Sequence, residues 1–117
     1  MNTIDAIRSR RTAHFYHDEA VDESHIERAL EAAIRAPNHK LTNPWRFTRV
    51  GPVAREKLVE LALELKSRKR EIKDGERARI RDKVAGAPVL MAFSQVLDDD
   101  AFRRREDYAS VACAIQN

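Results

Sequence analysis

The sequence contains few of the residues that cross-link a chain, bend it or carry it through a membrane. Its 117 residues include one cysteine, three glycines and four prolines, and aromatic residues make up 6%. The single cysteine, Cys113, cannot form an internal disulfide, which is typical of reducing, intracellular compartments. No apolar run is long enough to cross a bilayer, and none near the N-terminus resembles the hydrophobic region of a signal peptide. We therefore expect a soluble, cytoplasmic protein with no membrane partner.

Several common site motifs are absent as well. No Gly-x-Gly-x-x-Gly segment is present, which excludes a Rossmann-type nicotinamide site within this stretch. The histidines form no His-x-x-x-His pair and have no cysteine at ligand spacing, so we predict no metal site. Repeats and low-complexity linkers are missing too. With 43% hydrophobic residues, the chain can form one modest globular domain over residues 1–117.

Charge is present in both signs, with a small positive excess. The 22 Lys and Arg residues exceed the 19 Asp and Glu residues by a formal net charge of +3, which favours anionic ligands. The excess is concentrated in residues 66–83, where nine basic residues outnumber four acidic ones. This segment could bind nucleic acid or another anionic surface. The interleaved acids and the absence of a recognition-helix or RRM signature favour a solvated, charged helix and loop.

Apolar residues at helical spacing predict several helices. The clearest covers about residues 23–36, with Asp22 as its N-cap and Pro37 ending it. Its apolar face follows the i, i+3, i+4, i+7, i+8 pattern of Ile26, Ala29, Leu30, Ala33 and Ile34. A short helix capped by Thr3 is expected to end near Arg10-Arg11. Another begins at Pro52, and its expected inner face consists of Leu58, Leu61, Ala62 and Leu65.

Two strands and a last helix complete the predicted elements. Residues 45–50 are rich in aromatic and β-branched side chains, and Trp45 is expected to belong to the core. Val89–Phe93 is a continuous apolar run that predicts a central strand buried on both faces. Residues 98–100 offer aspartate caps for a helix whose expected inner face consists of Tyr108, Val111, Ala112 and Ile115. The same pattern makes Cys113 a small buried residue.

The turn between the second helix and the first strand concentrates polar side chains. Arg35-Ala36-Pro37-Asn38-His39-Lys40 is followed closely by Asn43-Pro44-Trp45. This turn offers a guanidinium, an imidazole and two side-chain amides, none of which is needed to end a helix. A second cationic cluster, Arg8-Ser9-Arg10-Arg11-Thr12, lies near the N-terminus. By themselves these groups fit either a solvated loop and a cation-stabilised helix end, or a site for an anionic ligand.

In this order and at these separations, the motifs resemble the N-terminal half of the nitroreductase family of flavoproteins. The likeness is to the short-chain branch with an RRS…RAPxHK…PW pattern, and Thr12 stands where many relatives have a serine. It implies an α+β fold, with helices around a central mixed β-sheet, in a domain-swapped homodimer. Family members continue with a Gly-rich turn, further helices and strands. Because the apolar pattern of the last helix is still developing at Asn117, we expect a domain incomplete at its C-terminus.

The resemblance also implies a set of cofactor-binding residues. Arg10, Arg11 and Thr12 would contact FMN from one subunit, and Arg35 and His39 would line the same pocket from the other. Guanidinium groups suit this role because they bind phosphate through two parallel hydrogen bonds. For His39 we expect hydrogen bonding to phosphate or flavin and no proton transfer.

An activity follows from the same resemblance. It implies an FMN-dependent oxidoreductase with NAD(P)H as co-substrate and a nitroaromatic or quinone-type electron acceptor. The reaction would be a ping-pong hydride transfer through the flavin, with no catalytic side chain in the usual sense. Two alternatives stay open. One is anionic-surface binding through residues 66–83, and the other is a flavoprotein of the same fold with a different redox reaction.

Overall fold

A two-stranded antiparallel sheet lies at the centre of residues 2–117, the part of the chain that the computed structural model describes. Its strands are β1 (Trp45–Arg49) and β2 (Met91–Gln95). Phe47 and Phe93 are opposite each other in the register, and their rings meet edge to face with centroids 4.9 Å apart. Such an aromatic pair stabilises the register of the two strands.

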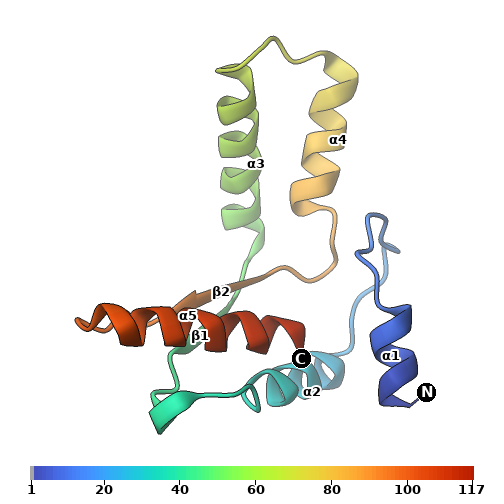
Figure 1. Cartoon of the computed structure of the whole chain (residues 1–117). Helices are drawn as coiled ribbons and strands as arrows, with labels where there is room; N and C mark the ends of the chain where they lie inside the picture. The colour runs from blue at the N-terminus through green and yellow to red at the C-terminus, as the bar shows by residue number, and fades with distance from the viewer. Residues whose placement is uncertain (1) are drawn as a thin grey trace.

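Helix α5 (Ala101–Gln116) lies across this sheet, and α2 (Glu23–Ala33) packs against α5 (Figure 1). The core between them is small and consists of Ala33, Ala36, Trp45, Val111 and Ala114, with Phe47 and Phe93 packed against it. Trp45 is therefore a core residue, as the sequence predicts. The sheet contributes aromatic rings to this core, and the helices contribute mainly small side chains.

The position and burial of β2 differ from the prediction. The strand begins two residues later than the apolar run suggests, and alternate residues are exposed, among them Ala92 and Ser94. A continuous apolar run does not by itself show how many faces of a strand are covered. In residues 2–117, β2 is covered on one face, and its pairing with β1 is antiparallel.

Helix α2 begins as predicted and ends earlier. The Asp22 carboxylate accepts a hydrogen bond of 2.8 Å from the Ser24 N–H. The α-helical pattern stops at Ala33, and the backbone N–H groups of Arg35 and Ala36 then bond three residues back. This tightening into a turn precedes Pro37, whose ring disfavours helical geometry in the residue before it.

The buried face of α5 is rotated relative to the predicted one. The residues that face inward are Asp107, Ser110, Val111 and Ala114. Tyr108 is 70% exposed and Ile115 is 61% exposed, so the expected inner face was wrong at these positions. Cys113, expected to be buried, is also exposed. The N-cap prediction is confirmed, because Asp100 accepts hydrogen bonds from the first N–H groups of the helix.

Helices α3 (Pro52–Ser67) and α4 (Asp74–Ala85) form a hairpin that projects from the sheet (Figure 1). They pack against each other and against no other helix or strand among the described residues. Val59 is 1% exposed, whereas Leu58, Leu61 and Leu65 of the predicted inner face are largely exposed. Helix α4 carries few large apolar residues.

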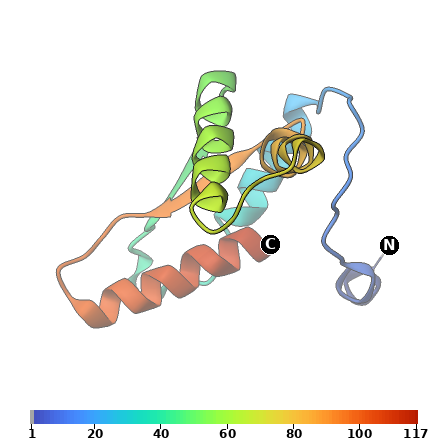
Figure 2. The same ribbon diagram turned by 90° about the horizontal axis from the view of Figure 1, so that it is seen from above.

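Helix α1 (Thr3–Ser9) stands apart from the other elements of residues 2–117, at the end of an extended segment (Figure 2). Its N-cap is Asn2, one residue before the predicted Thr3, and the Asn2 side chain accepts a hydrogen bond of 2.9 Å from the Asp5 N–H. Ile4 and Ile7, expected on an inner face, are exposed. No helix among the described residues combines the length and hydropathy that a membrane crossing requires.

Candidate functional site

The turn between α2 and β1 has an unusual backbone. It contains the short 3-10 helix η1 (His39–Leu41), and Lys40, Leu41 and Asn43 have φ values of 58°, 54° and 46°. The left-handed region is tolerated by asparagine but is unfavourable for lysine and leucine, at about 1–2 kcal/mol per residue. Such a conformation persists only where surrounding contacts determine it, and it is typical of binding and catalytic sites.

Side chains within the turn supply part of that support. The Asn38 Nδ2 donates to Asn43 Oδ1 at 3.0 Å, and the Asn43 Nδ2 donates to the Leu41 carbonyl at 3.2 Å. The Thr42 hydroxyl lies 2.9 Å from Asn38 Oδ1. These bonds link the two ends of residues 38–43 to each other.

Helix α5 supplies the remaining support from two adjacent acidic residues. The Thr42 Oγ1 lies 2.6 Å from Asp107 Oδ1, and Asp107 is only 5% exposed. The His39 Nδ1 lies 3.0 Å from both carboxylate oxygens of Glu106. The turn is thus held against the same helix that covers the sheet.

The structure brings together some of the predicted site residues and not others. Arg35 and His39 lie in or beside the turn, and both are exposed. Arg10, Arg11 and Thr12 follow α1, which lies far from the turn in the view of Figure 1. Within this chain, the two groups of predicted residues are therefore separate.

The predicted arginines keep their charge available. In the described part of the chain, Arg10, Arg11 and Arg35 make no ion pair and no side-chain hydrogen bond. Their guanidinium groups could therefore bind an anionic ligand, such as a phosphate, without first breaking an internal contact.

Sequence reasoning missed Thr42, Glu106 and Asp107. A signal for Asp107 was present, because it lies four residues before Val111 and so falls on the buried side of the same helix. A charged residue is rarely buried unless it has a partner. The partner Thr42 could not be found this way, since the two residues are 65 positions apart.

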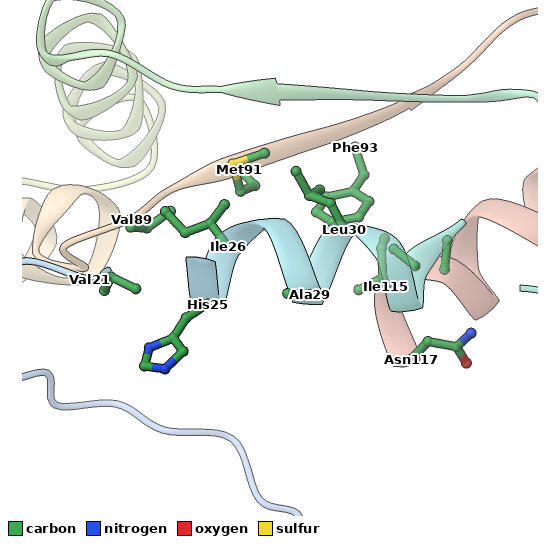
Figure 3. Close-up of a pocket in the computed structure, with 12 residues that line it drawn as sticks. Val21, His25, Ile26, Ala29, Leu30, Val89, Met91, Phe93, Ile115 and Asn117 are labelled. Carbon is green, nitrogen blue, oxygen red and sulfur yellow. The ribbon is translucent and has the colours of Figure 1, made fainter. Parts of the chain in front are cut away.

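A separate apolar groove of about 270 Å³ lies between α2, β2 and the end of α5 (Figure 3). Its walls include Ile26, Leu30, Met91 and Phe93. None of the five predicted site residues lines it. Among residues 2–117, no cluster of three or more His, Cys, Asp or Glu side chains could hold a metal ion.

The basic residues of the hairpin are partly neutralised by neighbouring acids. Arg70 binds both carboxylate oxygens of Glu76 at 2.5 and 2.8 Å, and Lys66 lies 3.5 Å from the same group. Arg81 of α4 pairs with Glu56 of α3 at 2.7 Å, which lowers the pKa of the Glu56 carboxyl. Several cations of residues 66–83 therefore hold the hairpin together.

Comparison with known proteins identifies the family to which this fold is similar. The sequence profile described as the nitroreductase family matches residues 7–117. In solved structures, the fold resembles the nitroreductase-like family protein from Bacillus cereus, with a TM-score of 0.74 and 27% identity. That likeness covers 99% of this chain and 61% of the B. cereus chain. The α+β, nitroreductase-like fold expected from the sequence is confirmed.

A curated relative points the same way. The Bacillus subtilis (strain 168) protein named "Putative NAD(P)H nitroreductase YfhC" is 31% identical over 117 residues, which cover 97% of this chain. Those residues correspond to 59% of the B. subtilis protein, so the chain spans about three fifths of the length of both relatives. From the profile match and the fold together, the chain belongs to the nitroreductase family.

Proposed function

We propose that the protein is an FMN-dependent oxidoreductase that takes hydride from NAD(P)H and reduces nitroaromatic or quinone-type acceptors in a ping-pong reaction. Family membership and the name of the B. subtilis relative support this activity. The observation that carries the proposal is the turn of residues 38–43, a strained backbone held by dedicated side chains beside Arg35 and His39. Strain of this kind is typical of ligand-binding segments.

The proposed FMN-binding residues are Arg10, Arg11, Thr12, Arg35 and His39. Their donors suit the chemistry of FMN, because guanidinium groups bind phosphate in a bidentate manner and a hydroxyl or imidazole can bond the ribityl chain or the ring. The His39 Nδ1 is directed at Glu106, which leaves Nε2 for a ligand. Arg10, Arg11 and Arg35, which make no ion pair in the described part of the chain, support the same assignment.

A second copy of the chain would complete this site. Nothing among the described residues packs against α1, and a helix of 7 residues is too short to be stable in isolation. We therefore expect its exposed Ile4 and Ile7 to pack against a partner surface. In the proposed homodimer, α1 carries Arg10, Arg11 and Thr12 to the turn of the other protomer, where Arg35 and His39 lie.

FMN, when bound, supplies the hydride acceptor and donor of the reaction. The residues of this chain bind and orient it, and none of them is assigned a proton-transfer role.

Two other activities were open from the sequence. Anionic-surface binding through residues 66–83 loses support, because Arg70, Lys66 and Arg81 are paired with acids. A different redox reaction on the same fold is distinguished by the acceptors that reoxidise the flavin.

The first test is the absorption spectrum of the purified complete protein, followed by release of any chromophore on denaturation. The proposal predicts flavin bands that bleach on addition of NAD(P)H. A colourless protein that takes up no added FMN would contradict it, and salt-dependent binding of nucleic acid would then be measured.

Substitutions test the site itself. Arg10→Ala and Arg35→Ala are each expected to weaken FMN binding by about tenfold or more, because each removes charge-assisted hydrogen bonds. The melting temperature without FMN should stay unchanged, since neither side chain has an internal partner. Arg79→Ala, an exposed arginine on α4 without an ion pair among the described residues, is the control. Stoichiometric FMN in both site variants would rule out the assignment.

A further inference from the structure

We infer that Asp107 and Glu106, adjacent residues of α5, are positioning residues for the FMN site. Asp107 acts through Thr42 on the backbone of residues 38–43, and Glu106 acts on the ring of His39. This inference rests on the proposed function, and it assigns a role to side chains that do not themselves reach the cofactor.

The burial of Asp107 is the first argument. The rest of the inward face of α5 consists of Ser110, Val111 and Ala114, which are small or apolar. A carboxylate at such a position is unfavourable unless a hydrogen bond compensates for lost hydration. Its side chain accepts a hydrogen bond from the Thr42 hydroxyl at 2.6 Å, short enough for a charge-assisted bond. An apolar residue would pack better at this position, so we assign the carboxylate the role of holding the turn through its hydrogen bond with Thr42.

The second argument is the backbone that Asp107 holds. Thr42 lies between Leu41 and Asn43, both of which have left-handed φ values. Its hydroxyl proton is directed at Asp107 Oδ1, the shorter contact at 2.6 Å, and the same oxygen lies 2.9 Å from Asn38 Oδ1 at the start of the turn. Without this connection, the local preference of Leu41 would favour an ordinary right-handed or extended conformation.

Glu106 provides the second anchor. Its two carboxylate oxygens lie equally close to His39 Nδ1, which fixes the direction of the imidazole ring. The carboxylate favours a proton on Nδ1, and Nε2 then points away from this contact. Together, the two acids determine where the turn lies and how its imidazole is presented.

Thr42→Val is the direct test, because it keeps the side-chain shape and removes the hydroxyl. FMN affinity, followed by fluorescence quenching on titration, is expected to fall by about tenfold. Amide hydrogen exchange of residues 38–43 in the FMN-free protein should become faster. Thr42→Ser, which keeps the hydroxyl, should restore both properties. Asp107→Asn keeps a hydrogen-bond acceptor without the charge, so its loss of FMN affinity should be smaller. This variant replaces Thr42→Val in the test if the valine variant does not fold.

Two controls separate positioning from general destabilisation. Thr48→Val makes the same change at an exposed position of β1, and Ser110→Ala removes a buried hydroxyl of α5 that bonds the Glu106 carbonyl of its own helix. Both should bind FMN within about twofold of the parent protein. Unchanged FMN affinity in Thr42→Val would overturn the inference, as would a loss of affinity without faster exchange in the turn. A parent protein that binds no FMN would instead refute the proposed function.

Discussion

At the scale of single residues, Arg55 determines how the α3–α4 hairpin is attached. Its guanidinium donates at distances of 2.5–3.2 Å to the backbone carbonyls of Val50, Ala85, Ala87 and Pro88. These carbonyls belong to both chain segments at the base of the hairpin, one before α3 and one at the end of α4. A single planar cation therefore joins the two segments, and it satisfies a carbonyl that the end of α4 leaves open.

Replacing Arg55 should destabilise the protein. Arg55→Met removes several charge-assisted bonds, and we expect the free energy of unfolding in urea to fall by about 2–3 kcal/mol. Arg55→Lys should recover little of this loss, because an ammonium group cannot reproduce the planar fork. Arg79→Met, at an exposed position of α4, is the matched control. Equal stability of the Arg55→Met and Arg79→Met proteins would show that the contacts at the base contribute nothing.

Glu76 makes the stability of the hairpin dependent on pH. Its hydrogen bonds with Arg70 lower the pKa of the carboxyl from 4.5 to about 2, and Lys66 adds a smaller contribution. A carboxyl with a depressed pKa stabilises the folded state above its unfolded value, and this contribution is lost as the pH falls toward the folded value. The melting temperature should therefore drop between about pH 5 and about pH 2. Glu76→Gln should flatten that drop, whereas Glu71→Gln should leave its slope unchanged.

At the scale of elements, α1 packs against no other helix or strand of residues 2–117. The proposed dimer predicts that Ile4→Asp combined with Ile7→Asp gives a monomer that loses FMN. The remaining fold should persist, because none of its described helices or strands packs against α1. Sedimentation velocity and the flavin absorbance measure the two effects. Val53→Asp, another exposed apolar position, is the control. A double variant that stays dimeric and yellow would show that α1 does not form the interface.

Several element boundaries depend on local chemistry, which is why they could be predicted from sequence. Asp22 and Asp100 cap their helices, and Gly51-Pro52 ends β1 and begins α3. The inner faces of α3 and α5 could not be predicted in the same way. An apolar stripe shows that a helix has a partner, but the partner's shape decides which residues it covers. On α5, the bulky rings of the sheet select small side chains and turn Tyr108 outward.

In the candidate site too, residues indicated by local sequence could be predicted, and residues brought together only by the fold could not. Arg35 and His39 were recognised because their turn has a characteristic local sequence, and the structure does place them together. Their role in binding FMN stays a prediction. Thr42 and Asp107 carry no such signal, because their contact joins residues that the fold alone brings near each other. The left-handed backbone was equally hidden, since Lys40 and Leu41 are not residue types that favour it.

At the scale of the whole molecule, apolar surface remains exposed on several sides. The groove between α2, β2 and the end of α5 is open (Figure 3). Exposed Phe15 and Tyr16 add to this surface on the segment after α1. Apolar patches of this kind favour association in water, which agrees with the proposed homodimer.

The base of the hairpin has a consequence for changes in chain length. The Val50 N–H bonds the Leu90 carbonyl at 2.9 Å, so the chain leaves the sheet and returns to it at one place. Residues added or removed at the distant tip, near residues 68–73, lengthen or shorten the hairpin outward and do not separate these two points. Insertions and deletions there leave the pairing of Phe47 with Phe93 in register. The hairpin is thus the part of this domain whose size can vary while the sheet and the turn before it stay the same.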